Sequence, residues 1–475
     1  MRKSRIFLYV ILFVILLGIF YFWMVKPAKD QSTTTTSISN NQVIDEAFQL
    51  IRKEAVFAKK ENILVEGAIR GMAEALEDPH SSYLTKEEAV AQESSLAEER
   101  VGIGVEITLS GGKFVVVSPL KDSPAYRAGL KPQDEIVRVN GERLDGKSMA
   151  ELVKLLSGEK GTSLKMTVYR SSEERHVELH MKREVIAMHT VSSEVYEVED
   201  FSIGIVTISI FGEKTGEEWA KQTKALVDRG IDGLLIDVRG NPGGYLYSVS
   251  SIVSTLLENG KTFAYMQDAN GVLEMLNTEN KEKPYLNKIP AVLLQNGGSA
   301  SASEVLAGAL KDNNRAMIVG ETSYGKGTVQ ESHPLSNGGK LKISTHKWLT
   351  PKQEWIHHKG IQADLEVEPE ELYTMDIKYP HGEFRVGDFG EEIKYVQNVL
   401  GALGYNIGRK DGYFDEDTMD GVEKYRQERS LEPSSDIDDA LFQSLTKTLM
   451  EYKTRKENDK QLQMGISYLV HEMKK

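Results

Sequence analysis

Residues 233–244 read Gly-Leu-Leu-Ile-Asp-Val-Arg-Gly-Asn-Pro-Gly-Gly, an apolar run that passes directly into a glycine-rich corner. An uninterrupted apolar run of this length is typical of a strand covered on both faces of a sheet. The same pattern recurs at Ala291–Gln295 and Ala316–Gly320. Helical patterns alternate with these strands, at residues 217–229, 247–257 and 303–310. This alternation predicts an α/β core, which we place at residues 184–375.

A second corner follows one of these strands and reads Asn-Gly-Gly-Ser-Ala-Ser-Ala-Ser-Glu over residues 296–304. Ligand sites of open α/β sheets lie just beyond the carboxyl ends of strands, although a glycine pair alone also fits a plain tight turn. Ser301 precedes an apolar helix, so we expect its hydroxyl near free N–H groups that favour a developing oxyanion. Ser303 fits the alternative role of helix cap, which leaves Ser301 free for chemistry.

A serine nucleophile needs a base, and the chain offers Lys326 because no histidine lies in a glycine-rich corner of this core. Glycines on both sides of Lys326 indicate a backbone that closely approaches another segment. Lys326 can act as a base only if burial lowers its pKa by about 3 units, which costs roughly 4 kcal/mol. We expect Gln330, four residues on, to orient Lys326 without adding charge. A phosphate-binding turn is the alternative, but the phosphate-loop spacing is absent.

These motifs carry a resemblance to a known family. Gly298-Ser-Ala-Ser-Ala-Ser-Glu304 is followed, 25 residues after Ser301, by the lysine of Gly-Lys-Gly-Thr-Val-Gln. This pair of motifs resembles the carboxy-terminal processing proteases, which are tail-specific Ser-Lys peptidases with a core related to the crotonase and Clp protease folds. Asp237–Gly244 matches a third motif of the family. A fourth is Gly-Met-Ala-Glu-Ala-Leu-Glu-Asp-Pro-His-Ser-Ser-Tyr at residues 71–83.

The resemblance covers about residues 65–370 and implies a serine endopeptidase that cleaves through an acyl-enzyme. It implies Ser301 as nucleophile, Lys326 as base and Gln330 as the residue that orients the base. The implied oxyanion hole consists of the N–H of Ala302 together with that of Gly243 or Gly244, and the sequence does not decide between these two glycines.

The regions around the core predict an α+β / α/β multidomain protein. Residues 42–99 have helical spacing, and the strand-rich residues 100–183 resemble an inserted PDZ domain. There, Gly102, Ile103, Gly104 and Val105 would form the loop that binds a peptide carboxylate, with an apolar last side chain beside Ile103 and Val105. Residues 385–450 resemble a small helical peptidoglycan-binding-like module, although Tyr425-Arg426 replaces its expected Phe-Gln. We expect the charged residues 451–475 to be a solvated helix or disordered.

The N-terminus predicts the compartment. Arg2, Lys3 and Arg5 precede an uncharged apolar run, Ile6–Val25, whose 20 residues would span about 30 Å as a helix. We therefore expect a membrane anchor or uncleaved signal at residues 1–27 and a flexible linker at 28–41, with the catalytic part outside the cytoplasm. A cleaved signal peptide, and hence a secreted protein, is the alternative.

The composition bears on which partners, metals and cofactors the protein could bind. With 58 Lys plus Arg against 71 Asp plus Glu, the acidic chain is atypical of nucleic-acid binders, and no cysteine is present for disulfides or thiol chemistry. The ten histidines show no metal-ligand spacing, so we expect no metal and no cofactor. Expected partners are proteins or peptides with accessible C-termini, the membrane and peptidoglycan, and the exposed apolar patterns are compatible with a homodimer.

Two other functions stay open on sequence alone. A catalytically silent PDZ and peptidoglycan-binding scaffold would keep the fold without Ser301, Lys326 and Gln330, yet all three are present. A crotonase-type acyl-thioester enzyme fits poorly with an anchor and a PDZ-like insert. The resemblance further suggests regulatory proteolysis in a Gram-positive bacterium, such as sporulation signalling, with the PDZ domain gating activity.

Overall fold

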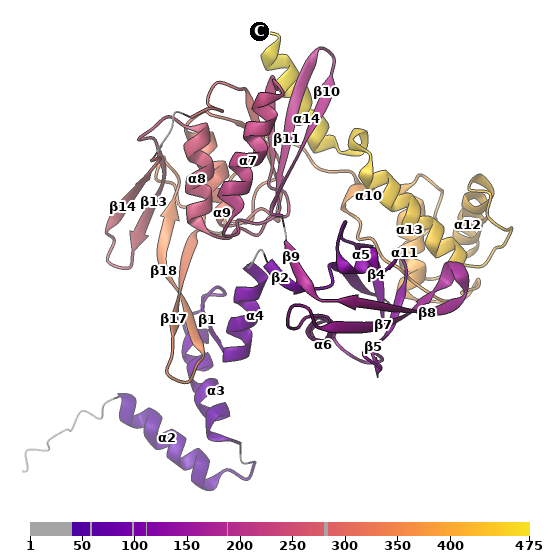
Figure 1. Cartoon of the computed structure of the whole chain (residues 1–475), viewed down its shortest axis with the longest axis horizontal. Helices are drawn as coiled ribbons and strands as arrows, with labels where there is room; N and C mark the ends of the chain where they lie inside the picture. Colours follow the sequence, from indigo (N-terminus) through magenta and orange to yellow (C-terminus); the bar gives the residue numbers. More distant parts are fainter. Residues whose placement is uncertain (1–39, 58, 97–98, 111, 188, 280–283) are drawn as a thin grey trace, which may run out of the picture. The chain divides into compact units, whose positions relative to one another are not determined.

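The computed structural model describes residues 40–57, 59–96, 99–110, 112–187, 189–279 and 284–475 (Figure 1). The predicted anchor at 1–27 and most of the predicted linker lie outside these ranges. Within them, no helix combines the length and the apolar character that crossing a membrane requires. The chain divides into two compact units, residues 1–75 and 76–475.

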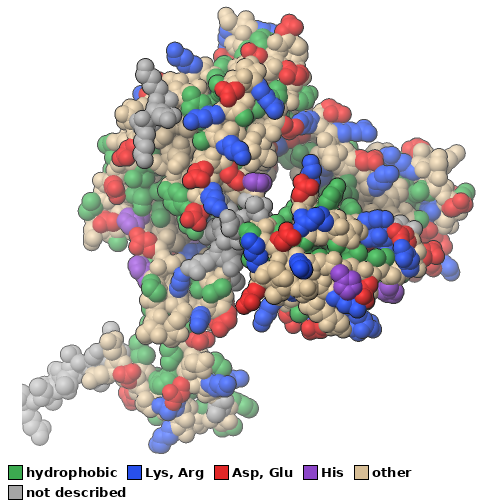
Figure 2. All heavy atoms as spheres, in the orientation of Figure 1, with side chains coloured by type: hydrophobic (Ala, Val, Ile, Leu, Met, Phe, Trp, Pro, Cys, Tyr) green, Lys and Arg blue, Asp and Glu red, His purple; other side chains and the backbone are tan. Residues whose placement is uncertain are grey.

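The described part of the first unit contains two helices, α2 (Asn40–Glu54) and α3 (Glu61–Glu74), as the spacing in this segment predicts. Large apolar side chains of this unit are exposed, among them Ile44, Ile51 and Phe57. Figure 2 shows such hydrophobic side chains beside charged ones of both signs, which are interspersed over the visible face.

The core of the second unit is a six-stranded sheet in the order β10-β11-β12-β15-β16-β19. Only its first pair is antiparallel; the following pairs are parallel, which is the arrangement expected from alternating strands and helices. The strands are β10 (Val191–Val198), β11 (Phe201–Ile208), β12 (Gly233–Asp237), β15 (Ala291–Gln295), β16 (Met317–Gly320) and β19 (Leu365–Glu366).

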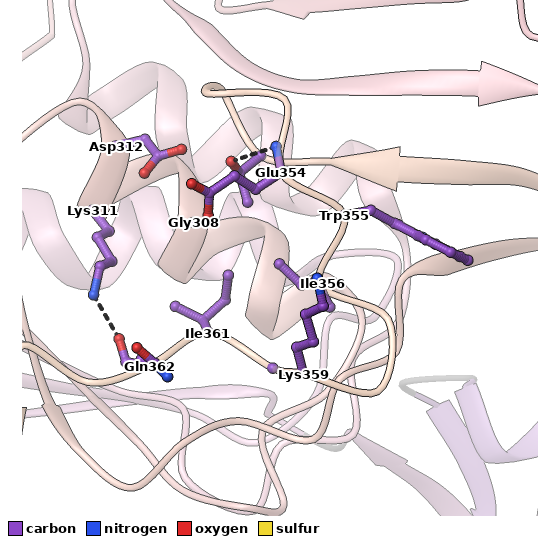
Figure 3. Close-up of a pocket in the computed structure, with 11 residues that line it drawn as sticks. Gly308, Lys311, Asp312, Glu354, Trp355, Ile356, Lys359, Ile361 and Gln362 are labelled. Carbon is purple, nitrogen blue, oxygen red and sulfur yellow. Dashed lines mark hydrogen bonds between the residues drawn. The ribbon is translucent and has the colours of Figure 1, made fainter.

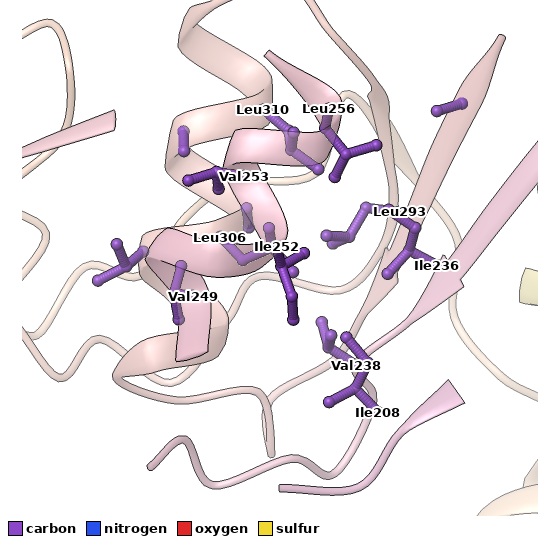
Figure 4. Close-up of a cluster of buried hydrophobic side chains, with 14 of the residues drawn as sticks. Ile208, Ile236, Val238, Val249, Ile252, Val253, Leu256, Leu293, Leu306 and Leu310 are labelled. Carbon is purple, nitrogen blue, oxygen red and sulfur yellow. The ribbon is translucent and has the colours of Figure 1, made fainter. Parts of the chain in front are cut away.

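Helices cover both faces of this sheet. On one face, α7 (Thr215–Asp228), α8 (Leu246–Leu256) and α9 (Ala302–Asp312) lie at the predicted places. Figure 4 shows Ile252 of α8 and Leu306 of α9 on the side of the helices that faces Ile236 and Leu293 of the sheet, and all four belong to one buried cluster. Leu235 and Val292, one residue away on the same strands, point to the other face. That alternation explains why these strands are apolar throughout.

The second face is covered by the segment that we expected to be solvated or disordered, so this expectation is wrong. After a short 3-10 helix η2 (Lys456–Asn458), α14 (Lys460–Met473) packs on the sheet. Its buried apolar residues share one cluster with the sheet, and they are Leu462, Ile466, Leu469 and Val470. The charged side chains of α14 lie on its other faces, which is why the composition suggested a solvated segment.

A second sheet beside the core contains β1 (Ser82–Leu84), β13 (Thr262–Asp268), β14 (Leu273–Asn277), β17 (Thr328–Pro334) and β18 (Lys340–Leu349). The hairpin β17–β18 follows Lys326 directly, and β1 pairs with β18 through Ser82 and Lys342. This sheet therefore brings the segment after α3 and the lysine segment into the same region. The helix α4 (Lys86–Leu96) follows β1.

The strand-rich module has its own core and sheet, built around Phe114, Leu152 and Val168. Its elements are β3 (Val105–Ser110), β4 (Lys113–Pro119), α5 (Pro124–Arg127), β5 (Glu135–Val139), β6 (Glu142–Arg143), α6 (Met149–Leu156), β7 (Ser163–Arg170), the 3-10 turn η1 (Ser171–Glu173) and β8 (Arg175–Lys182). The chain enters through β2 (Glu99–Gly102) and leaves through β9 (Glu184–Ala187), which pair with each other. The module is therefore an insertion with adjacent ends.

The C-terminal module packs three helices around a core that includes Val396, Tyr425 and Leu445. The helices are α11 (Glu391–Ala402), α12 (Glu416–Glu428) and α13 (Asp439–Thr454), preceded by the short α10 (Glu371–Thr374). Buried Tyr425 and Arg426 are accommodated: Tyr425 bonds Ser444 and Thr448, and Arg426 donates to the Glu432 and Asp436 carbonyls. The unexpected residue pair therefore leaves the helical fold intact.

Candidate active site

Ser301 lies at the corner between β15 and α9, in a backbone conformation that side chains rarely adopt. Its φ is 53° and its ψ is −112°, outside the usual left-handed region. Such strain persists only where the surroundings impose it, and it is common at functional sites. Ser301 itself occupies the N-cap position of α9. The expectation that Ser303 caps the helix is wrong, because Ser303 is buried and its hydroxyl donates to the Asn241 carbonyl at 2.9 Å.

The two glycine corners are hydrogen-bonded to each other. The Asn241 carbonyl also accepts from the Ala300 N–H at 3.0 Å, and the Gly240 N–H donates to the Asn296 side chain at 2.8 Å. Gly243 has φ 104°, and a Cβ there would lie 2.8 Å from both the Ala300 oxygen and the Ser301 Cβ. Glycine at this position thus permits the Asp237–Gly244 corner to contact Ser301 directly.

Gly243 and Gly244, between which the sequence did not decide, differ in their hydrogen bonds. The Gly243 N–H already donates to the Asn241 side-chain oxygen at 2.9 Å. Gly244 forms an isolated parallel bridge with Phe211, in which the bonds are Phe211 N–H to Gly243 O and Tyr245 N–H to Phe211 O. Those bonds do not use the Gly244 N–H. The local geometry thus favours Gly244 over Gly243 as the donor to a ligand beside Ser301.

Lys326 is held between two glycines that contact a neighbouring loop, as its sequence context indicates. A Cβ on Gly325 would lie 3.0 Å from the Gly360 and Lys359 nitrogens, and one on Gly327 would lie 2.8 Å from the His357 nitrogen. The Lys326 carbonyl accepts a hydrogen bond from the Trp348 indole at 2.7 Å. The backbone of Lys326 is therefore fixed on both sides and at its carbonyl.

The surroundings of Lys326 lower the pKa of its ammonium group. Burial lowers the pKa of Lys326, and the positive charge of Lys342 lowers this pKa further. Asp78 and Glu304 act in the opposite direction but do not reverse the shift. The direction is the one that a lysine base requires.

Glu304 connects the serine corner to the lysine segment. Its side chain is fully buried, and one carboxylate oxygen accepts from the Ser301 N–H at 2.7 Å and from the Lys326 N–H at 2.8 Å. The other oxygen accepts from the Gly325 N–H at 2.6 Å and the Ser323 hydroxyl at 2.7 Å. A single carboxylate thereby positions the backbones of Ser301 and Lys326 together.

Gln330 lies in the same region but with different partners from those we expected. Its amide nitrogen donates to Thr328 at 2.9 Å and to the Ser344 hydroxyl at 3.0 Å. Ser344 in turn hydrogen-bonds Asp78. The orientation of Lys326 by Gln330 therefore stays a prediction, and the contacts that hold Gln330 run toward Ser344 and Asp78.

One cavity of about 610 Å³ gathers the predicted residues of the core. Its lining includes Gly243, Gly244, Ser301, Ala302, Lys326 and Gln330. Apolar side chains such as Met266, Leu276 and Trp348 also line it, and the cationic Lys340 and Lys342 lie on the same side of β18. Residues from three separate motifs of the sequence, the two glycine corners and the lysine segment, thus converge on one space, which is large enough for a peptide segment.

Sequence reasoning quoted Glu304 in a motif without giving it a role, and it did not identify Asp78 or Ser344. The Ser-x-x-Glu spacing of Ser301 and Glu304 is the pattern of a helix capping box and could have indicated a link between them. The role of Ser344 had no local signal, because it depends on the pairing of β1 with β18.

A second cavity, of about 400 Å³, lies at the other end of α9 (Figure 3). Lys311 donates to the Gln362 carbonyl there at 2.7 Å, and the Glu354 N–H donates to the Thr350 hydroxyl. None of the predicted catalytic or oxyanion residues lines it. The predicted catalytic and oxyanion residues therefore line the first cavity and not the second.

In the strand-rich module, the predicted loop lies between β2 and β3. Gly104 has φ 70°, and its carbonyl accepts from the Ser123 hydroxyl at 2.8 Å and the Leu120 N–H at 3.0 Å. Ile103 is buried in the module core, whereas Val105 is only partly buried. Of these two side chains, Val105 is thus the better placed to contact an added peptide.

Comparison with known proteins adds independent evidence. The model for Peptidase family S41 matches residues 202–367, and a PDZ domain model matches 115–170. The model for the Activating protease CtpB N-terminal domain matches residues 24–88, and a peptidoglycan-binding domain model matches 389–445.

Individual relatives match over most of their length. The carboxy-terminal processing protease CtpB of Bacillus subtilis (strain 168) is 37% identical over 430 residues, which is 90% of this chain and 88% of that protein. CtpA of the same strain is 32% identical over 444 residues, 93% of each chain. Among solved structures, a photosystem II D1 C-terminal processing protease is 27% identical, with a TM-score of 0.44 and coverage of 69% of this chain and 87% of that one.

The family models and the curated relatives define the class of the protein as a serine-type peptidase with a PDZ domain. Within that class, the chain belongs to the carboxy-terminal processing proteases of peptidase family S41, of the CtpA/CtpB type.

Proposed function

We propose that this protease works by a Ser-Lys mechanism, with Ser301 as nucleophile and Lys326 as general base. The observation that carries the proposal is the shared cavity, in which a strained serine and a lysine with a lowered pKa lie together. Glu304 fixes both backbones and Gln330 lies beside the lysine segment. The oxyanion donors in this mechanism are the N–H groups of Ala302 and Gly244.

The reaction proceeds in two halves. Neutral Lys326 accepts the Ser301 proton as Oγ attacks the scissile carbonyl carbon, whose oxygen becomes the oxyanion. The C–N bond then breaks, Lys326 returns the proton to the departing amine, and an acyl-enzyme remains. Water attacks the ester carbonyl while Lys326 accepts a proton from it. That proton returns to the Ser301 oxygen, and the acid product leaves.

We further propose that the PDZ domain selects substrates by their C-terminal end. An added peptide strand would pair with a sheet edge, and backbone N–H groups of Gly102–Val105 would hold the terminal carboxylate. The apolar run at Ile6–Val25 supports a membrane anchor and an extracytoplasmic catalytic part. We also propose that the C-terminal module contacts peptidoglycan and that the protein forms a homodimer. Its proteolysis would serve a regulatory role.

The decisive experiment offers the protein an unfolded substrate with an apolar C-terminus. We expect Ser301→Ala and Lys326→Ala each to lower kcat by at least about 10³-fold with little change in folding. Matched controls are Ser251→Ala and Lys352→Ala, which alter residues of the same core that do not line this cavity. Cleavage that continues in both Ser301 and Lys326 variants would refute the mechanism.

A further inference from the structure

A buried ion cluster joins the Asp237–Gly244 corner to the segment that precedes α14. The Arg239 guanidinium donates to both oxygens of Asp237, at 3.0 and 2.7 Å, and to both oxygens of Asp459, at 2.8 and 2.7 Å. It also donates to the Gln461 side chain at 3.1 Å. The side chains of Arg239, Asp237 and Asp459 are 13%, 14% and 4% exposed, so water screens this cluster little.

Asp459 has two functions in this cluster. Besides binding Arg239, its carboxylate accepts from the Leu462 N–H at 3.1 Å and so caps the first turn of α14. The Tyr373 hydroxyl donates to the same carboxylate at 3.0 Å. Burial alone would raise the pKa of Asp459, but the charge and hydrogen bonds of Arg239 outweigh burial and hold this pKa below its usual value. Asp459 is therefore a fixed anion at physiological pH.

Arg239 lies close in sequence to the groups that contact the serine corner. Asn241 binds Ala300 and Ser303 through its carbonyl and the Gly243 N–H through its side chain. Gly244 follows directly. A shift of Arg239 would consequently move Asn241 and the two glycines, because this short turn is held by hydrogen bonds and its residues cannot move independently. A displacement of about 1 Å at such a position can cost about 100-fold in rate.

We propose that α14, through Asp459 and Arg239, holds the glycine corner in the position that stabilises the oxyanion. Asp459 is on this view a positioning residue that acts through Arg239, although it lies outside the region matched by the peptidase family model, residues 202–367. The proposal rests on the Ser-Lys mechanism proposed above and adds the segment after the C-terminal module to the machinery of that site.

The test compares Asp459→Asn with a matched control in the full-length chain. Asparagine caps helices as well as aspartate does, so α14 keeps its cap while Arg239 loses a charged, two-oxygen partner. The control is Asp415→Asn. Asp415 caps α12 in the same way, through the Thr418 N–H at 2.9 Å, and contacts no residue of the glycine corner. Asp459→Glu restores the charge on a longer side chain.

Two measurements are made on each variant. For peptide cleavage, we expect Asp459→Asn to lower kcat about tenfold or more, while KM stays within about twofold of wild type. Asp459→Glu should recover part of the lost kcat. The control Asp415→Asn should have the kcat and KM of wild type. For amide hydrogen exchange, which needs no activity, we expect faster exchange in residues 237–244 in Asp459→Asn alone.

The outcomes separate this proposal from the mechanism on which it rests. Unchanged exchange at residues 237–244 together with kcat within twofold of wild type overturns the role of Asp459. A loss of activity that only follows a loss of folded protein, seen equally in Asp459→Glu, also overturns it. If the Ser301→Ala variant still cleaves the peptide, the Ser-Lys mechanism is refuted. The hydrogen-exchange measurement then still decides whether α14 holds residues 237–244 in place.

Discussion

At the residue scale, the pKa of Lys326 depends on charged residues other than the predicted Ser301, Lys326 and Gln330. The sequence indicated Ser301 and Lys326 as candidates because each stands in a glycine-rich segment after a buried strand, and because the two motifs together resemble a known family. It could not identify the neighbours that set the pKa of Lys326, since Lys342 and Asp78 are brought near by the pairing of β1, β17 and β18. The contact between Gln330 and Ser344 could not be predicted for the same reason, because Ser344 lies on the paired strand β18.

Lys342 provides a pH-dependent test at this scale. Its positive charge lowers the pKa of Lys326, so Lys342→Gln should raise that pKa. Less Lys326 is then neutral at a given pH below the pKa, and the rising limb of kcat/KM should move to higher pH. The pH profile of peptide cleavage measures the shift. Lys352→Gln, which does not line the cavity, should leave the limb in place; a limb that stays in place in Lys342→Gln as well would contradict the electrostatic role.

Glu304 provides a second test. Glutamine has one acceptor oxygen where the carboxylate has two, and its NH₂ would face N–H donors. Glu304→Gln should therefore lower the free energy of unfolding by about 2–3 kcal/mol and lower kcat. Urea denaturation followed by tryptophan fluorescence measures the stability, because the described tryptophans, Trp219, Trp348 and Trp355, all lie in the protease core. Glu331→Gln, an exposed control on β17, should change the unfolding energy by less than about 0.5 kcal/mol.

At the element scale, local patterns predicted the strands and helices of the core closely, because the buried strands are uninterrupted apolar runs and the helices have helical spacing. Helix α14 was the main failure. Leu462, Ile466 and Leu469 do recur at helical spacing, but the surrounding charges resemble those of a solvated helix. The apolar sheet face that this stripe covers belongs to strands far away in the sequence, so no local pattern could assign the two to each other.

The packing of α14 can be tested by truncating one side chain on each face. Leu469 is fully buried against the sheet, and Leu469→Ala should lower the free energy of unfolding by about 3 kcal/mol. Met464 is 42% exposed, and Met464→Ala should change it by less than about 0.5 kcal/mol. Urea denaturation again provides the measurement. Equal effects of the two substitutions would mean that α14 does not cover the sheet.

At the scale of the whole molecule, the PDZ domain enters and leaves the chain through the paired strands β2 and β9. Because Gly102 and Glu184 are register partners, an Asn-Gly turn can join them in place of residues 103–183. We expect this shortened chain to keep a folded protease core. It should lose the preference for peptides with a free C-terminal carboxylate over the same peptides with a C-terminal amide.

The ratio of kcat/KM for the acid and amide forms of one peptide tests that expectation. Full-length protein should show a ratio well above one, and the shortened chain a ratio near one. An unchanged ratio would place the recognition of chain ends outside the PDZ domain. Absolute rates on a short unstructured peptide measure in the same experiment whether the domain gates the site.

The position of α14 on the second face of the sheet also bears on how the protein is made. Ribosomes synthesise the chain from its N-terminus, so β12, β15 and β16 emerge long before the helix that covers them. During that interval Leu235, Val292 and Leu294 lack their covering layer, and Arg239 lacks Asp459. In this order of synthesis, the sheet gains its second covering layer, and Arg239 its partner Asp459, only after the segment 459–473 has emerged.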